Sequence, residues 1–275
     1  MICKSINYHT ILSDECSDVI ALHRQVFPHQ EVVRSIYACR GVARYLASLI
    51  AFPKWQREHM LWGAWVRDRL VGYAYFRALP GVFHLNNIAI SPEYQGRDIG
   101  DALWAYFIQT ARERGYRQVS LDVASENERA LRWYRRKGLR ITATTWVYEK
   151  PVQRTAYNIE AVKLLDWEQA EAWQMAYGFS HFRLVYGEKC WTIGRLGKDY
   201  YRLDQLLPAE VEGILAHIDS SRRLLLNSSK RIAASSPWSK VDVSFRMYGE
   251  VGRDTYDDSG FPKAGRDGHG GRSAS

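Results

Sequence analysis

Residues 88–103 read IAISPEYQGRDIGDAL, and this stretch decides the fold. An apolar, strand-like run leads into a loop that contains Gly96, and an amphipathic helical pattern starts at Gly100. The amides of residues 95–101 are expected to point into the N-terminus of that helix, where unpaired N–H groups and the helix dipole favour a pyrophosphate. The glycines let the main chain approach phosphates closely, and Arg97 adds a positive charge. The stretch therefore predicts a binding site for a nucleotide-like cofactor.

Strand-like and helix-like periodicities surround this stretch. Apolar residues alternate in the strand-like runs and recur at steps of three and four in the helical ones. Ser125 and Glu128 have the spacing of a capping box, which marks the start of a helix. The expected elements are a strand at 7–12, helices from 13 or 14 and at 32–50, strands at 61–66, 70–77 and 83–90, a helix at 100–114, a strand at 119–123, a helix ending at Gly138, and strands at 141–149 and 157–165. We expect the last two strands to close a first α+β unit.

Two motifs of this unit resemble the Gcn5-related N-acetyltransferase (GNAT) superfamily. Residues 88–103 resemble its pyrophosphate-binding motif, Gln/Arg-x-x-Gly-x-Gly/Ala, and Asn127, Ala130, Tyr134 and Gly138 have the spacing of the family's next helix. The resemblance covers residues 60–165 and extends to the first two helices. It implies a mixed, mostly antiparallel sheet with helices on both faces. It also implies that an acetyl group moves from acetyl-CoA, the co-substrate, to an amine.

The resemblance assigns roles in binding the coenzyme. In the family, the strand before the loop splays from its neighbour and its backbone hydrogen-bonds the pantetheine arm. Asn127 resembles a residue that hydrogen-bonds the same arm, although an Asn at a helix start also serves as a local cap. The expected cofactor-binding residues are Ile88, Ala89, Ile90, Gln95, Gly96, Arg97, Asp98, Ile99, Gly100, Asp101, Asn127, Ala130 and Tyr134.

Asp98 departs from the family pattern, because it occupies the place of the motif's first glycine. Asp tolerates the left-handed backbone that this position requires. Its carboxylate is nevertheless expected to weaken coenzyme binding by repelling the phosphates, unless Arg97 offsets it.

Tyr134, Asp122 and His84 are the expected catalytic residues. An ordinary tyrosine is protonated at neutral pH, so Tyr134 can act as the general acid toward the departing thiolate; the alternative is an aromatic side chain packed between helix and sheet. Asp122, twelve positions before the tyrosine, resembles the place of the glutamate base in the ribosomal-protein N-terminal acetyltransferase branch. Where another family base often sits, the chain has Asn86 and Asn87, which leaves His84 as a second candidate base acting through water.

The rest of the chain suggests a second, smaller α+β unit that repeats the first only loosely and could be a degenerate GNAT-like unit. Its expected elements are a helix at 166–176, strands at 182–186, 190–195 and 200–203, a helix at 208–218 and a strand at 223–226. Residues 250–275 are rich in Gly, Asp, Arg and Ser and are expected to form a disordered tail. The predicted division is therefore 1–165, 166–249 and 250–275.

Composition limits the function classes. The 275 residues carry a net charge of +8, which favours a polyanionic partner without choosing one. The four cysteines and eight histidines lack metal-ligand spacing, so we expect no metal; no apolar run is long enough to cross a membrane, so we expect a cytoplasmic protein. The acceptor is expected to be either an amine-bearing small molecule or a protein or peptide. The protein is expected to be either a monomer or a homodimer. Two alternatives are a GNAT-like module that binds acyl-CoA without turnover, and a basic nucleic-acid- or ribosome-associated protein.

Overall fold

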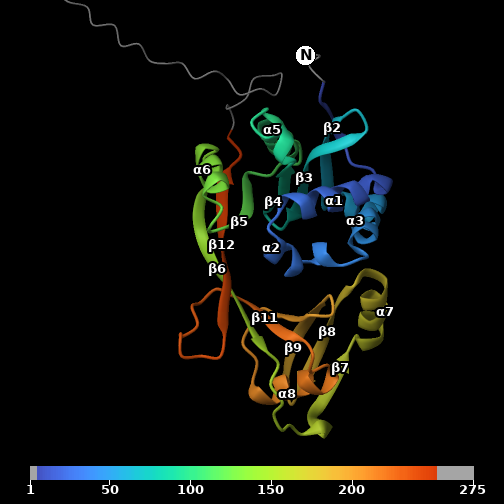
Figure 1. Ribbon diagram of the computed structural model, residues 1–275, viewed down its shortest axis with the longest axis vertical. Helices are drawn as coiled ribbons and strands as arrows, with labels where there is room; N and C mark the ends of the chain where they lie inside the picture. The colour runs from blue at the N-terminus through green and yellow to red at the C-terminus, as the bar shows by residue number, and fades with distance from the viewer. Residues whose placement is uncertain (1–4, 253–275) are drawn as a thin grey trace, which may run out of the picture.

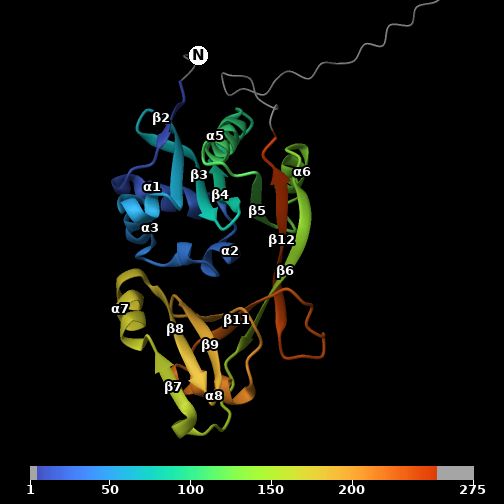
Figure 2. The same ribbon diagram turned by 180° about the vertical axis from the view of Figure 1, so that it is seen from behind.

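The computed structural model describes residues 5–252, which form one 12-stranded sheet with the strand order β1-β2-β3-β4-β5-β12-β6-β11-β10-β9-β8-β7 (Figures 1 and 2). Two neighbouring pairs are parallel, β4 with β5 and β10 with β11, and the others are antiparallel. The expected mixed, mostly antiparallel α+β fold is confirmed. The disordered tail is predicted for 250–275, but Glu250 is the last residue of β12, and residues 253–275 lie outside the described residues.

The half of the sheet from β1 to β6 belongs to the first unit. Its elements are β1 (Asn7–Thr10), η1 (Ser13–Glu15), α1 (Cys16–Val26), α2 (His29–Val33), η2 (Ile36–Ala38), α3 (Val42–Ala51), α4 (Pro53–Gln56), β2 (His59–Val66), β3 (Arg69–Leu79), β4 (Val82–Ile90), η3 (Pro92–Tyr94), α5 (Ile99–Glu113), β5 (Gln118–Ala124), α6 (Glu128–Arg136) and β6 (Arg140–Pro151).

Helices cover both faces of this half. Leu103, Phe107 and Ala111 of α5 are fully buried against one face, beside Phe76 and Phe83 of the strands. On the other face, residues of α1 and α3 form a second core with aromatic side chains of β2 and β3. Burial of each methylene group in such a core stabilises the fold by about 0.8 kcal/mol, so these two layers fix the position of β4 between them.

The second unit repeats the order of the first. Its elements are η4 (Ile159–Ala161), β7 (Val162–Leu165), α7 (Trp167–Tyr177), β8 (Phe179–Tyr186), β9 (Lys189–Leu196), β10 (Tyr200–Leu203), α8 (Ala209–Ile218) and β11 (Arg223–Ser228). The run from β8 to β11 matches the run from β2 to β5, including one helix between two parallel strands. Its core lies between α8 and the strands.

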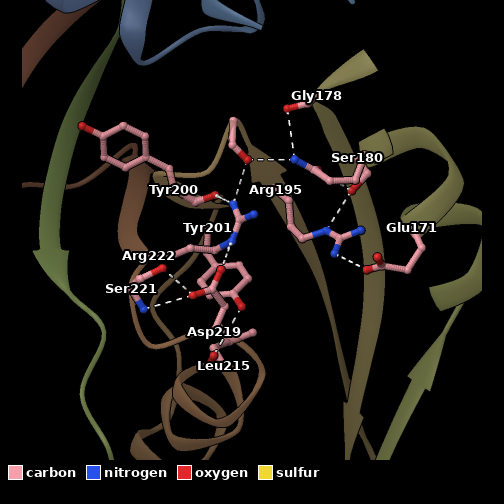
Figure 3. A network of polar contacts seen from close by, with 12 residues as sticks. Glu171, Gly178, Ser180, Arg195, Tyr200, Tyr201, Leu215, Asp219, Ser221 and Arg222 are labelled. Carbon is pink, nitrogen blue, oxygen red and sulfur yellow. Dashed lines mark hydrogen bonds and ion pairs between the residues drawn. The ribbon is translucent and has the colours of Figure 1, made fainter. Parts of the chain in front are cut away.

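Two buried arginines hold the second unit together (Figure 3). Arg222 is 7% exposed; its Nε donates to Asp219 (2.9 Å), and its Nη1 donates to the carbonyls of Gly197 and Tyr200 (both 3.1 Å). Arg195 donates to Ser180 and forms an ion pair with Glu171 of α7. Because the carbonyls belong to the β9–β10 turn, Arg222 fixes that turn against the end of α8.

The last strand of the described chain, β12 (Ser239–Glu250), belongs to the first unit's half of the sheet. It inserts between β5 and β6 and pairs with both. The prediction that 157–165 closes the first unit is wrong, because β7 pairs with β8 at the far edge instead. β6 is long enough to pair with β12 along most of its length and with β11 through residues 146–151. The division at residue 165 stays a prediction.

Two local expectations also need correction. The predicted helix at 32–50 is interrupted by η2 and by Gly41, where a Cβ atom would lie 2.5 Å from the carbonyl oxygen of Ala176. This close approach brings the first unit against α7. The expected capping box at Ser125 is absent: the N-cap of α6 is Asn127. Within residues 5–252, no helix combines the length and apolarity needed to cross a membrane.

Candidate functional site

A cleft opens in the first unit where β4 and β5 diverge. The two strands pair in parallel only as far as Leu85 and Leu121. β4 then continues to Ile90 without β5 beside it, because β5 pairs with β12 on its other side. At the point of divergence, Asn86 is the extra residue of a bulge in the β3–β4 pairing, which bends β4. A cavity of about 650 Å³ occupies the gap.

The free edge of β4 offers main-chain hydrogen-bonding groups to this cavity. In a strand, the N–H and C=O groups of alternate residues point to the same edge. The side chain of Gln95 donates to the carbonyl of Ile90 from the open side (3.2 Å), so Ile88 also presents its backbone there. Ala89 faces β3, where it lies opposite Tyr73. The backbone role expected of all three residues therefore falls on Ile88 and Ile90.

The loop between β4 and α5 carries the expected unpaired amides. The first intrahelical hydrogen bond runs from the Ala102 amide to the Asp98 carbonyl (2.9 Å), so the amides of residues 99–101 precede it. Gly96 has a φ of 75° and Asp98 a φ of 56°, both in the left-handed region. Asp98 thus adopts the backbone that a glycine would, and its exposed side chain does not cap the helix. An anion at this helix start is favoured by the amides and the dipole.

The side chains of the loop are arranged around Gln95. Its Oε1 accepts from Nη1 of Arg129 on α6 (2.6 Å), which ties α6 to the loop. Arg97 extends over the ring of Tyr94, with 5.0 Å from its guanidinium carbon to the ring centroid. No ion pair joins Arg97 to Asp98, so the offset of the Asp98 charge that we expected from Arg97 is not made through direct contact. Arg97 is also the one expected loop residue from 95 to 101 that does not line the cavity.

Asp101 is neutralised by α6. Its carboxylate pairs with Lys137 (2.5 Å) and accepts from the indole of Trp133 (3.3 Å). These contacts hold α6 beside the start of α5, so both helices border the same cavity.

One face of α6 carries Asn127, Ala130 and Tyr134 into the cavity. The side-chain oxygen of Asn127 accepts from the Ala130 amide (3.1 Å), so the local-cap interpretation is correct for that atom. A carboxamide has donors as well, and its Nδ2 group stays available for a ligand. The cap therefore orients the side chain and does not exclude a role in binding.

Tyr134 lies at the bottom of the cleft and is 6% exposed. Among residues 5–252, no group forms a hydrogen bond with its hydroxyl, although the side chain packs against Trp104 and Trp133. Burial raises the pKa of Tyr134 above its ordinary value. The hydroxyl is therefore protonated at neutral pH and open to a partner in the cavity.

Asp122 lines the cavity, but another side chain already binds its carboxylate. Arg246 of β12 donates from Nε to Oδ1 and from Nη2 to Oδ2, the latter at 2.8 Å. Such a two-pronged pair is among the strongest hydrogen-bonded arrangements of a carboxylate. Asp122 as a base stays a prediction, and it would have to leave this partner to accept a proton.

His84 is not part of the cavity lining. It is 5% exposed, its Nδ1 hydrogen-bonds the hydroxyl of Ser120 (2.9 Å), and its Nε2 lies 4.0 Å from Asp122. Burial lowers the pKa of His84 to about 4, and Asp122 opposes this only in part. The ring thus lies outside the cavity lining, and the role of His84 as a base acting through water stays a prediction.

Sequence analysis missed two carboxylates that line the cavity, Glu31 of α2 and Asp242 of β12. A signal for the second existed: Val241, Val243, Phe245 and Met247 alternate with polar residues, as in a strand with two different faces. Asn86 and Asn87, dismissed as bases, also line the cavity, and the Asn87 carboxamide accepts from the hydroxyl of Tyr37 (2.6 Å).

Comparison with known proteins agrees with this geometry. Residues 30–139 match the model of the acetyltransferase (GNAT) family. A Bacillus subtilis protein provisionally named as a ribosomal protein bS18-alanine N-acetyltransferase is 31% identical over 70 residues, which are 26% of this chain and 46% of that relative. The match thus spans less than half of the relative's length.

Two solved structures share the fold along most of the chain. A tandem GNAT protein from the clavulanic acid biosynthesis pathway has a TM-score of 0.67 at 11% identity and covers 91% of this chain and 100% of its own. A GCN5-related N-acetyltransferase from Sphaerobacter thermophilus has a TM-score of 0.59 at 13% identity and covers 90% of this chain and 96% of its own. At such identities the likeness concerns the fold alone. Residues 30–139 are thus similar to the acetyltransferase (GNAT) family, and the overall fold is similar to that of a tandem GNAT protein.

Proposed function

We propose that the protein transfers an acetyl group from acetyl-CoA to an amine in the cleft between β4 and β5. The observation that carries this proposal is the shared cavity, which is bordered by the loop amides, by the free edge of β4 and by the Tyr134 side chain. These are the groups that a diphosphate, a pantetheine arm and a departing thiolate require, and they follow one another along one groove. Its volume of about 650 Å³ lies within the range of ligand sites, which is about 300–1,000 Å³.

The residues of the chain divide the work. The amides of residues 99–101 and Arg129 bind the phosphates, and the backbone of Ile88 and Ile90 aligns the arm along β4. These contacts hold the thioester next to the amine, which lowers the entropic part of the activation barrier for acetyl transfer. Tyr134 gives its proton to sulfur as the carbon–sulfur bond breaks.

A first experiment separates binding from transfer. Acetyl-CoA should raise the Tm of the protein, because a ligand that binds only the folded state stabilises it. Release of free CoA with an amine panel then measures transfer. Tyr134→Phe should lower kcat by about 10²- to 10⁴-fold and leave the Kd of acetyl-CoA unchanged. Tyr116→Phe is the matched control, since Tyr116 packs on the same core but does not line the cavity.

Three outcomes would contradict the proposal. Absence of any Tm shift with acetyl-CoA would remove the coenzyme site. A full rate in Tyr134→Phe would remove the proposed acid. Binding without CoA release for every amine would leave an acyl-CoA-binding module, the alternative that Asp98 motivated.

Asp98 can be tested separately. Asp98→Gly removes an exposed carboxylate near the proposed phosphates while glycine accepts the left-handed φ of 56°. An exposed charge interaction of up to about 1 kcal/mol corresponds to an affinity gain of about two- to fivefold. An unchanged Kd at low salt would refute the repulsion argument.

One coenzyme should bind per chain, because the corresponding strands of the second unit do not diverge. There, β10 stays paired with β11 along its whole length, from Tyr200 to Leu203. The segment before α8 contains no glycine between residues 203 and 209. Titration calorimetry with acetyl-CoA is expected to give a stoichiometry of one, and a value of two would place a site in the second unit.

A further inference from the structure

The proposed acetyl-transfer cleft has a second end, formed by α2 and the start of β12. In Figures 1 and 2, α2 faces β12 across a gap, and residues of both elements line the cavity. Glu31 from α2 and Asp242 from β12 line the cavity here, together with Val26 and Phe27 at the end of α1. Both carboxylates are half-buried. The cavity thus reaches from the loop amides at one end to a pair of carboxylates at the other.

The protein offsets the charge of these two carboxylates only in part. Within residues 5–252, no ion pair involves Glu31 or Asp242, whereas Asp122 is bound by Arg246. Asp242 accepts only from the Val243 amide (2.7 Å). Burial raises the pKa of Glu31, and the negative charges of Asp242 and Glu126 add to the rise. Burial likewise raises the pKa of Asp242, while the Val243 amide and the positive charge of Arg34 oppose that rise only in part. Two like charges that are both partly desolvated and unpaired favour a cation between them.

Tyr134 supplies an independent indication that a ligand belongs between these ends. It is 94% buried, it lines the same cavity, and its hydroxyl has no hydrogen-bond partner in the described chain. The hydroxyl is open to the cavity, where a ligand group can complete its hydrogen bonding. The lining has Arg129 and Arg136 from α6 as well as Asp98 and Asp101 from the loop, whereas its α2 and β12 residues carry negative charge alone. Such polarity suits an anionic coenzyme and a cationic acceptor that meet between the two ends.

We propose that Glu31 and Asp242 bind the acceptor, and that the acceptor is a polycationic amine. This inference rests on the proposed acetyl transfer and names the substrate class of the same cleft. One carboxylate binds the ammonium group that reacts, and the other binds a second positive charge of the acceptor. A free diamine and a basic peptide amino terminus share this chemistry.

The carboxylates also take part in proton transfer. The ammonium group first gives one proton to Glu31, which passes it to water, and the neutral nitrogen then attacks the thioester carbon. The carbon–nitrogen bond forms, the carbon–sulfur bond breaks, and sulfur takes the proton of Tyr134. The second proton that nitrogen loses on becoming an amide restores Tyr134. The products are the acetylated amine, free CoA and one proton, so atoms and charges balance.

The first test uses the native protein and three acceptors of equal length: 1,4-diaminobutane, 4-amino-1-butanol and 4-aminobutanoate. They share the reacting amine and differ in the charge at the far end. At low salt and saturating acetyl-CoA, kcat/KM should fall by about tenfold at each step from positive to neutral to negative. A short peptide with lysines at its second and third positions, compared with its glutamate counterpart, distinguishes the peptide source from the free amine.

The second test uses variants. Glu31→Gln and Asp242→Asn should each raise KM for the diamine by about tenfold and remove most of its advantage over the amino alcohol. Glu31→Gln should also lower kcat, because glutamine cannot take the proton of the ammonium group. The Kd of acetyl-CoA should not change, which also verifies that the variant is folded. Glu188→Gln is the matched control, because it removes one exposed carboxylate in the β8–β9 turn and should retain the native order of acceptors.

The outcomes of these tests distinguish a failure of the polycationic acceptor from a failure of the proposed acetyl transfer. If acetyl-CoA does not bind the native protein, the proposed function fails. If CoA is released but the three acceptors react equally, or the amino acid reacts best, the polycationic acceptor is overturned and acetyl transfer stands. If the acceptor order survives in both variants, other groups select the charge and the assignment of Glu31 and Asp242 is overturned.

Discussion

Met247 of β12 offers the sharpest test of how the two halves of the chain depend on each other. Its side chain is fully buried in the core between α5, α6 and the strands of the first unit. The preceding buried residue of that core, Leu139, lies 108 positions earlier in the sequence. Met247→Ala should destabilise the first unit by about 3 kcal/mol, since removal of a buried Met, Leu or Ile side chain costs about 2–5 kcal/mol. The site cannot collapse easily, because β12 is paired on both sides.

Hydrogen exchange measured by mass spectrometry reports each unit separately. A loss of about 3 kcal/mol should speed exchange of the most protected β4 and β5 amides by about a hundredfold. Peptides of β8 and β9 should change little. Leu226→Ala, in the core of the second unit, is the reciprocal control and should show the opposite pattern. If Met247→Ala instead speeds exchange in β8 and β9 and spares β4 and β5, the assignment of β12 to the first unit's core is refuted.

Three further predictions concern single sites. Gly96→Ala should lose about 1–2 kcal/mol from its left-handed φ of 75°, whereas Gly100→Ala, with no atom within 3.4 Å of the new methyl group, should be neutral; thermal unfolding of the pair checks this. Arg222→Ala should destabilise the protein by about 2–4 kcal/mol, measured by urea unfolding, because it removes the ion pair to Asp219 and leaves two carbonyls without their donor. Burial lowers the pKa of His23 to about 3 and that of His84 to about 4, so between these values and about 6.5 the unfolded chain binds protons that the folded chain does not. The free energy of unfolding should therefore fall as the pH drops from about 6.5 toward 4. A rise over this pH range would contradict the prediction.

The local part of the site could be predicted from the sequence. The run from β4 through the loop into α5, and the face of α6 that carries Asn127 and Tyr134, depend on spacing within a few residues. The left-handed backbone of Asp98 was also predictable, because the motif requires it and Asp tolerates it. Such features are fixed by neighbours in sequence.

The distant part could not be predicted, because pairing partners far apart leave no local signal. The sequence predicts Asp122 as a base because it does not reveal that Arg246, 124 positions away, binds its carboxylate. His84 has a suitable titratable ring, but its burial against Ser120 follows from the parallel pairing of β4 and β5. The alternation around Asp242 indicates a strand but does not indicate which strands it pairs with.

The position of β12 has a consequence for how the protein is made. A ribosome delivers the segment from β7 to β11 before residues 239–250, so the later half can pack its core while the earlier half still lacks an inner strand. The usual order of co-translational maturation is thereby reversed. A nascent chain that lacks β12 has neither Asp242 in the cleft nor Arg246 beside Asp122, so the proposed acetyl transfer should begin only once synthesis has passed β12.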